Sequence, residues 1–211
     1  MNDPQASLRP AASGAPRLDL SSLVQSWPLP SRPRPIVIIG AGGIVNDAHL
    51  PAYNKAGFQV TGIFDIDRER SRATAERFAI GRVFERLEEC FEDPEAVIDI
   101  AVPPQNVLGI LEAVPEGRTV LIQKPLGLDL KQAREIRDMA QSRRLCAAVN
   151  FQLRFSPMML ALRSAVEKGL LGDILDVDLH LRIYTPWRMF PYLARLERVE
   201  ILVHSVHYLD W

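Results

Sequence analysis

The chain has 211 residues, a net charge of −1 and 47% hydrophobic residues. This composition supplies a core for one large domain or for one and a half. The nearly balanced charge gives no electrostatic footprint for nucleic acid or for an anionic membrane. No stretch approaches the ~20 apolar residues of a membrane span, and the N-terminus lacks the pattern of a signal peptide. We therefore predict a globular cytoplasmic protein with small-molecule partners, no nucleic-acid partner and no membrane partner.

The first 34 residues differ in composition from the rest of the chain. Residues 1–34 are rich in Pro, Ala, Ser and Arg, which predicts a mostly disordered extension. One apolar patch, Leu18 to Trp27, is expected to dock on the folded body as a helical turn. The two cysteines, Cys90 and Cys146, have no metal-type spacing, so we expect free thiols in a reducing compartment.

Residues Pro35 to Ile44 contain an apolar run that is followed directly by a glycine-rich turn. The run predicts a buried strand, and the segment from Ile44 toward Ala56 predicts a helix. The turn matches two of the three glycines of Gly-x-Gly-x-x-Gly, and Val45 holds the third place, which implies a wider helix–strand spacing or a shifted register. The expected pyrophosphate cradle consists of Gly40, Gly42, Gly43 and Ile44. A methyltransferase turn, Gly-x-Gly-x-Gly, is disfavoured because position 44 is Ile.

A second predicted strand, Gln59 to Asp65, ends in a carboxylate ~20 residues past the glycines, where a ribose-binding acid is expected. Asp65 is therefore predicted to bind the adenosine ribose, and its charge favours NAD over NADP. Three basic residues follow closely and keep NADP as the alternative: Arg68, Arg70 and Arg72. In the alternative interpretation, Asp65 and Asp67 cap the helix at 68–78.

Strands and helices alternate from Pro35 to Asn150. This pattern predicts the fold class α/β, a doubly wound parallel-sheet Rossmann domain over residues 35–150 with helices on both faces. Further strands are expected near Val83 and at residues 96–101, 119–123 and 145–149. Helical segments are expected at 87–91, through Leu111, and at 129–141 with Asp129 as N-cap.

Ligands of such sheets bind beyond the carboxyl ends of the strands, so the residues after each strand are candidates for the site. Pro103 and Pro104 would form a stiff wall beside the cofactor. Lys124 would project its amine into the same crevice, where burial lowers the pKa of a lysine and allows proton exchange with a substrate hydroxyl. A solvated lysine before a proline is the alternative interpretation of the same position.

These residues together resemble the Gfo/Idh/MocA oxidoreductase family, from about Pro35 to Trp211. The resemblance rests on the glycine turn, on Asp65 and on four further segments: His49–Ala52, Ala101–Pro104, Val120–Pro125 and Asn150–Pro157. It implies a hydride-transferring enzyme in which Lys124 is the catalytic lysine of a Glu-Lys-Pro motif and His207 the catalytic histidine of a His-x-x-Asp segment. It also implies that Arg154 lies near the substrate and that the nicotinamide lies against Pro103 and Gln123.

Three positions depart from the family pattern. Gln123 replaces the motif glutamate, Val107 stands where many members carry a histidine, and Val203 stands where an aspartate often precedes the catalytic histidine. His204 is the candidate substitute for that aspartate at the substrate site. Although His204 and His207 share a helix face, no further ligand completes a zinc-type spacing, so no metal is expected.

The two remaining histidines are assigned no chemistry. His49, at a helix start, is expected to pack or cap, and His180 is expected to be a satisfied surface histidine.

The second part of the chain, residues 151–211, predicts a helix at 157–168, one strand at 174–184 and a helix from about Glu200. One strand cannot make a stable sheet, so we expect a truncated α+β substrate and oligomerisation domain. A homo-oligomer is expected only if that domain is complete, and the loop at 185–188 is a candidate for substrate specificity.

Two functions follow from these observations. The first is an NAD(P)-dependent dehydrogenase or reductase that acts on a sugar, cyclitol or similar polyol. The alternative is a catalytically incompetent dinucleotide-binding remnant or sensor that lacks most of its substrate domain.

Overall fold

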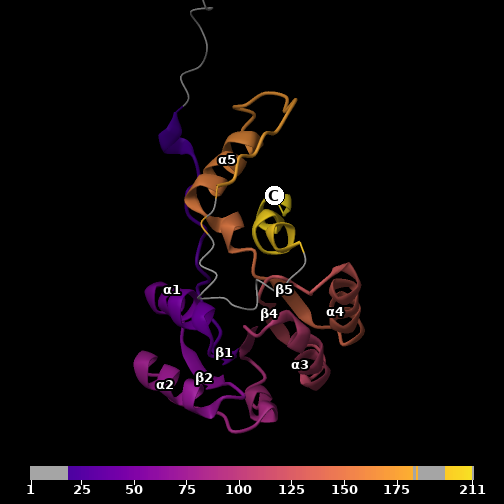
Figure 1. The fold of residues 1–211 in the computed structure, drawn as a ribbon. Coiled ribbons are helices and arrows are strands. Elements are labelled where there is room, and N and C mark those ends of the chain that lie inside the picture. The colour runs from indigo at the N-terminus through magenta and orange to yellow at the C-terminus, as the bar shows by residue number, and fades with distance from the viewer. Residues whose placement is uncertain (1–18, 183, 185–197, 211) are drawn as a thin grey trace, which may run out of the picture. The chain divides into compact units, whose positions relative to one another are not determined.

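A computed structural model describes residues 19–182, 184 and 198–210. Five parallel strands form one sheet in the order β2-β1-β3-β4-β5 (Figure 1). The strands are β1 (Ile36–Ile39), β2 (Val60–Phe64), β3 (Val97–Ile100), β4 (Thr119–Ile122) and β5 (Cys146–Val149). The predicted parallel α/β sheet is confirmed. The strand expected near Val83 is instead a single parallel bridge to Ile63, because its neighbours do not continue the ladder.

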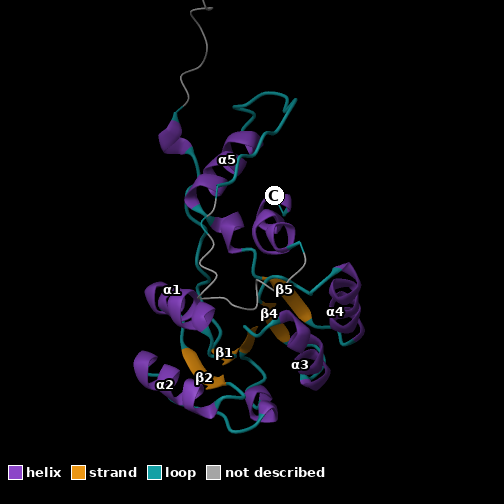
Figure 2. Cartoon of the chain, in the orientation of Figure 1, coloured by secondary structure: helices purple, strands orange, loops and turns teal. Residues whose placement is uncertain are grey.

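Helices lie between successive strands, and two further α-helices follow β5 (Figure 2). The α-helices are α1 (Leu50–Ala56), α2 (Arg68–Phe78), α3 (Val107–Ala113), α4 (Leu130–Ser142), α5 (Pro157–Glu167) and α6 (Val206–Leu209). π-helices span Val45–His49 and Glu200–Ser205, and 3-10 helices span Leu20–Ser22, Leu87–Phe91, Pro104–Asn106 and Gln152–Phe155. Asp67 and Asp129 cap α2 and α4 by accepting the N–H groups of Arg70 and Gln132, as Ser, Thr, Asn and Asp commonly do at this position.

The sheet carries a separate apolar core on each face. Successive side chains of a strand point to opposite faces, so Ile36 and Ile38 pack with Leu50 and Ala75 of α1 and α2. The alternate residues of the strands pack with α3 and α4, in a core that includes Val37, Ile39, Ile98, Leu111 and Ile136. Asp99 is paired with Ile38. Its carboxylate therefore lies on the face that α1 covers.

Contacts divide the chain into two units, residues 28–154 with 181–211 and residues 1–27 with 155–180. In the second unit, the Trp27 ring packs edge-on to Phe155 at 5.3 Å, and the Val24 N–H donates to Ser164 Oγ of α5 at 3.2 Å. The apolar patch thus docks through a short 3-10 turn and Trp27. This grouping differs from the boundaries expected at 34/35 and 150/151, which stay predictions.

The strand expected at 174–184 is wrong for the described residues, which have no regular structure at 174–182 and at 184. Their alternating apolar pattern has no partner strand in the described part of the chain, and a strand forms only by pairing. The loop at 185–188 lies outside the described residues. His180 is exposed and pairs with Asp178 at 2.9 Å, as expected for a surface histidine.

The two cysteines are free thiols, and burial raises the pKa of the Cys90 thiol to about 12. Among the described residues, no helix has the length and apolar character needed to cross a membrane.

We expect the substitution Gly40→Ala to destabilise the fold strongly. Gly40 has φ +109°, and an added Cβ would clash with the Ala101 carbonyl oxygen. Such a left-handed backbone alone costs a residue with a side chain about 1–3 kcal/mol. Urea unfolding measures the effect, with Gly42→Ala as the matched control because nothing lies within 4 Å of its added Cβ. Equal losses in the two variants would contradict this account of the turn.

Candidate functional site

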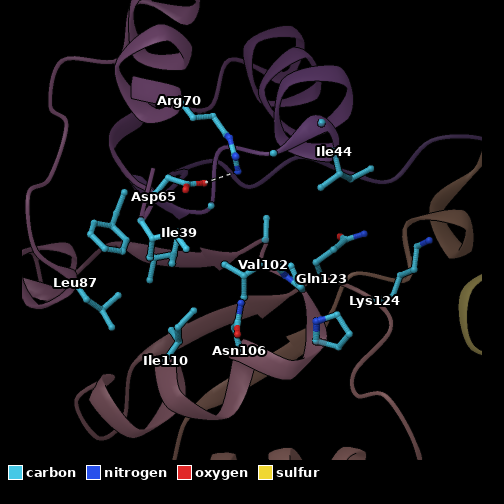
Figure 3. A pocket seen from close by; sticks show the side chains of 18 residues that line it. Ile39, Ile44, Asp65, Arg70, Leu87, Val102, Asn106, Ile110, Gln123 and Lys124 are labelled. Carbon is cyan, nitrogen blue, oxygen red and sulfur yellow. Dashed lines mark ion pairs between the residues drawn. The ribbon is translucent and has the colours of Figure 1, made fainter. Parts of the chain in front are cut away.

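A cavity of about 670 Å³ opens at the carboxyl ends of the strands. Its walls come from the glycine turn after β1, the end of β2, and the segments that follow β3 and β4. Figure 3 shows Asp65 and Arg70 on one part of the wall and Gln123 and Lys124 on another. Residues predicted from the sequence that line this one cavity include Gly40, Gly42, Gly43, Ile44, Asp65, Arg70, Pro103, Pro104, Gln123 and Lys124. Their roles toward a ligand stay predictions.

The two motif glycines serve different purposes. Gly40 is required by the protein itself, because its backbone lies against the Ala101 carbonyl and its N–H donates to Phe64 O at 2.7 Å. Gly42 lines the cavity, yet no protein atom lies within 4 Å of a Cβ built on it. A side chain at position 42 would therefore enter the cavity rather than meet protein, which fits a turn that leaves room for a close ligand.

The helix after the turn begins with a π-helical segment at Val45–His49. Val45 is fully buried where the motif has glycine, and a π-turn makes a wider coil than an α-turn. The expected change of helix–strand spacing or register stays a prediction. Asn46 Nδ2 donates to the carbonyls of Ala41 and Gly42 at 3.0 and 3.1 Å, which fixes the turn to the helix.

Asp65 holds the glycine turn against the end of β2. Its Oδ2 accepts the Ala41 N–H at 2.7 Å, and its Oδ1 accepts the Asp67 N–H at 2.8 Å. Arg70 Nη1 lies 3.8 Å from Oδ2 and also lines the cavity. The contact with Ala41 was missed in the sequence, because only the fold brings residue 41 beside residue 65. Arg68 and Arg72 pair with Glu85 instead.

Lys124 and His207 occupy the same region of the chain's fold. Lys124 Nζ donates to the Val203 carbonyl at 3.3 Å, and burial lowers the pKa of the lysine. Burial also lowers the pKa of His207, followed by the charge of Lys124, while Asp210 opposes both effects. His207 is buried, and its Nδ1 has no hydrogen-bond partner among the described residues. Lys124 lines the cavity and His207 does not, so the contact of His207 with a substrate stays a prediction, while burial lowers the pKa of both groups.

The two predicted substrate residues are engaged in ion pairs. Arg154 binds Asp210 through Nε at 2.8 Å and Nη2 at 2.6 Å. His204 Nδ1 lies 2.8 Å from Glu200 Oε2. Neither lines the cavity, so their contact with a substrate stays a prediction. The described residues contain no group of three or more His, Cys, Asp or Glu side chains placed to hold a metal.

A buried polar cluster lies behind the cavity wall. His49 Nδ1 is 2.7 Å from Asp99 Oδ2, which also accepts the Tyr53 hydroxyl at 2.9 Å. On its other side, His49 Nε2 lies 3.2 Å from Gln123 Oε1 and 3.2 Å from Asn150 Nδ2. His49 and Asp99 are both buried. The packing role expected for His49 is thus a polar one, and the signal in the sequence was a carboxylate in the middle of an apolar strand.

The charges of this cluster follow from its geometry. Burial alone would lower the pKa of His49, but the hydrogen bond and charge of Asp99, together with Gln123, leave it raised. Burial and Asp99 raise the pKa of the Tyr53 hydroxyl, which stays protonated and donates. The hydrogen bond and charge of Asp99 thus favour the protonated form of the His49 ring. Asp99 Oδ1 has no hydrogen-bond partner in the described part of the chain.

A parallel sheet with a glycine turn over its carboxyl ends defines a Rossmann-type α/β protein. A family model described as "Oxidoreductase family, NAD-binding Rossmann fold" matches residues 34–151, and the chain belongs to this Gfo/Idh/MocA family. The resemblance based on the motifs is thereby confirmed.

The matches with individual relatives cover only part of each relative's length. Glucose-6-phosphate 3-dehydrogenase of Bacillus subtilis is 28% identical over 70% of this chain and 42% of its own. 1,5-Anhydro-D-fructose reductase of Ensifer adhaerens is 31% identical over 82% of this chain and 54% of its own. The structure of a super-repressor mutant of Gal80p from Saccharomyces cerevisiae matches with a TM-score of 0.58, 25% identity and coverage of 68% and 41%. The chain thus spans about half the length of the curated relatives it matches.

The His49–Asp99 pair predicts a pH-dependent contribution to stability. A pKa raised in the folded state means that the contribution is complete below 6.5, the ordinary value, and is lost as pH rises through the folded-state pKa. We expect the stability advantage of the wild type over His49→Asn to be larger at low pH than at high pH. Urea unfolding at pH 6 and pH 9 measures it. An advantage that is the same at both pH values would contradict a His49 pKa that is raised in the folded state.

Proposed function

We propose that this protein is an NAD(P)-dependent oxidoreductase that transfers hydride between a nicotinamide and a hydroxyl or carbonyl carbon of a sugar, cyclitol or similar polyol. One observation carries the proposal: the glycine turn and Lys124, far apart in the sequence, line the same cavity. A turn of this kind suits a pyrophosphate, and a buried lysine suits proton exchange. Oxidation of a hydroxyl by hydride transfer needs a bound cofactor that takes the hydride and a group that takes the hydroxyl proton.

The residues of the cavity fit a dinucleotide. The backbone from Gly40 to Ile44 would hold the pyrophosphate, because Gly42 lines the cavity and leaves open space for a ligand to approach the backbone. Asp65 would accept the ribose hydroxyls, since a carboxylate has about four acceptor positions and only two are used by backbone N–H groups. The nicotinamide ring would lie against Pro103 and Gln123. When bound, the dinucleotide supplies or accepts the hydride.

The chain's own residues would handle the proton. Lys124 Nζ, with its lowered pKa, would take the proton of a substrate hydroxyl in the oxidative direction and return it in the reductive one. His207 would assist through Nδ1, the buried ring nitrogen that has no partner in the described part of the chain. The Val203 carbonyl, which accepts from Lys124 Nζ, would keep the amine near this histidine.

The names of the relatives support a small sugar as substrate. One relative is named for a sugar phosphate and another for an anhydro-sugar. Arg154 and His204 are proposed to lie near that substrate, with residues 151–211 contributing part of its domain. A homo-oligomer is proposed only for a protein in which that domain is complete.

NAD is the proposed preferred cofactor, with NADP as the weaker one. The carboxylate of Asp65 would repel a 2′-phosphate. Arg70, which lines the cavity within 3.8 Å of that carboxylate, would offset part of the repulsion.

A dinucleotide-binding sensor without turnover is the second candidate. It is favoured by the similarity to Gal80p, whose structure is described as that of a super-repressor mutant. Gln123 in place of the motif glutamate also removes a charge beside Lys124. Binding of NADH with no turnover on any polyol would support this candidate over the enzyme.

The preference for NADH predicts opposite effects of two substitutions. Arg70→Ala should weaken NADPH binding roughly tenfold and leave NADH binding nearly unchanged, because it removes a charge-assisted contact to the 2′-phosphate. Asp65→Asn should reduce the ratio of NADH affinity to NADPH affinity, because the carboxylate that repels the 2′-phosphate is lost. Calorimetric titration measures both, with Arg68→Ala as the control because Arg68 pairs with Glu85 and does not line the cavity. Equal NADPH losses in Arg70→Ala and Arg68→Ala would contradict the proposed role of Arg70.

The role of Lys124 predicts a loss of turnover without a loss of binding. Lys124→Met should lower the rate about 10²–10⁴-fold, the usual contribution of a general acid or base. Its affinity for ADP-ribose should stay within about twofold of the wild type, since the amine is far along the wall from Asp65 (Figure 3). A turnover screen over D-glucose 6-phosphate, 1,5-anhydro-D-fructose and simple polyols supplies the assay. Lys131→Met, on the exposed surface of α4, is the matched control. Unchanged turnover in Lys124→Met would rule out the lysine as the proton carrier.

A further inference from the structure

Gln123 links the buried polar cluster to the cavity. Its carboxamide oxygen lies 3.0 Å from Asn150 Nδ2 and 3.2 Å from His49 Nε2, so the oxygen faces the protein interior. Its side-chain nitrogen makes no hydrogen bond among the described residues, and the residue lines the cavity. A carboxamide is planar with oxygen and nitrogen on opposite sides. Holding the oxygen inward therefore presents the NH₂ group to the cavity.

The imidazole of His49 decides which way the carboxamide is held. Asp99 Oδ2 can only accept, so His49 Nδ1 carries a hydrogen and donates to it. In the imidazolium form Nε2 also donates, and the group it faces at 3.2 Å is Gln123 Oε1. Tyr53 and Asp99 are the other titratable groups of the cluster: Asp99 accepts from the ring, Tyr53 donates to Asp99, and neither contacts the carboxamide.

Asn150 completes the arrangement. Its Nδ2 lies within 3.2 Å of both His49 Nε2 and Gln123 Oε1. When Nε2 is protonated, it and Asn150 Nδ2 are both donors, so they do not hydrogen-bond each other and both converge on the Gln123 carbonyl oxygen. A reversed carboxamide would place an NH₂ group against two donors, which leaves buried hydrogens unpaired and is unfavourable.

We propose that His49 is a positioning residue for the ligand of the cavity: with Asn150 it fixes the Gln123 carboxamide so that its NH₂ group donates to a carbonyl oxygen of that ligand. The inference rests on the proposed function, in which this acceptor is the carboxamide oxygen of the nicotinamide. The departure from the family motif then has a chemical meaning. An ionised glutamate at position 123 would offer acceptors alone, whereas glutamine offers a neutral donor. His49, 74 residues earlier in the sequence, contacts the glutamine that replaces the motif glutamate.

The test compares NADH with ADP-ribose, which has the same adenosine and pyrophosphate but no nicotinamide. Calorimetry on the full chain gives the ratio of the two affinities. In His49→Asn, an amide replaces Nδ1–H toward Asp99 while nothing reaches Gln123. We expect the NADH advantage over ADP-ribose to shrink roughly three- to tenfold, with ADP-ribose affinity unchanged. Gln123→Ala should do the same, and the double variant should lose no more than either alone.

Tyr53→Phe is the matched control. It removes a hydrogen bond to the same Asp99 oxygen but does not touch Gln123, so the affinity ratio should stay at the wild-type value. A second readout follows the side-chain NH₂ resonances of Gln123 in ¹⁵N-labelled protein. NADH should shift them and ADP-ribose should not, and the shift should be lost in His49→Asn.

The outcomes separate this inference from the proposed function. If both nucleotides bind and His49→Asn leaves their affinity ratio unchanged, the positioning role is wrong while the cofactor site stands. The same holds if Tyr53→Phe lowers the ratio as much as His49→Asn, since the effect would then come from disturbing Asp99. If neither nucleotide binds the wild type, the proposed function fails and this inference fails with it.

Discussion

Asp99 places a carboxylate in β3, the middle strand of the five-stranded sheet, where its side chain is fully buried. An uncompensated charge in such a place is far more costly than a paired one. The compensation comes from His49 and Tyr53, at the end of the π-helix and on α1. Because His49 in turn contacts Gln123 and Asn150, one buried charge ties the first helix to the ends of β4 and β5. Through Gln123, which lines the cavity, this pairing reaches the cavity wall.

Local features of the sequence predicted most of the sheet and its turns. Apolar runs followed by glycine, proline or a capping aspartate marked β1, β3, β4 and the starts of α2 and α4, since each signal lies within a few residues. The predicted cavity residues also gathered at one edge, because parallel strands bring their carboxyl ends together. The long-range contacts were not predictable in this way. Nothing near Asp65 indicates its bond to Ala41, and nothing near His49 indicates Asp99. Apolar and polar residues alternate at 174–184 as they do in a strand, yet a strand forms only when another part of the chain pairs with it.

The cavity combines two environments along its wall. At one part, Asp65 and Arg70 offer opposite charges beside the glycine turn. At the other, Gln123 is neutral and Lys124 has a lowered pKa, so charge is scarce where proton exchange is proposed. An adenosine ribose with its pyrophosphate suits the first environment, and an uncharged carboxamide with a substrate hydroxyl suits the second. The relatives carry about as much chain again beyond this match. Membership of the family therefore does not by itself identify the substrate.

The central claim is that the cavity over the carboxyl ends of the sheet is a dinucleotide site. The most direct test is an NMR titration of uniformly ¹⁵N-labelled protein with NADH, in which backbone amide shifts are mapped onto the structure. The account predicts that the largest shifts fall on Gly40 to Ile44, at Asp65 and beyond the end of β3. Shifts confined to other surfaces, or no shifts at saturating NADH, would contradict it.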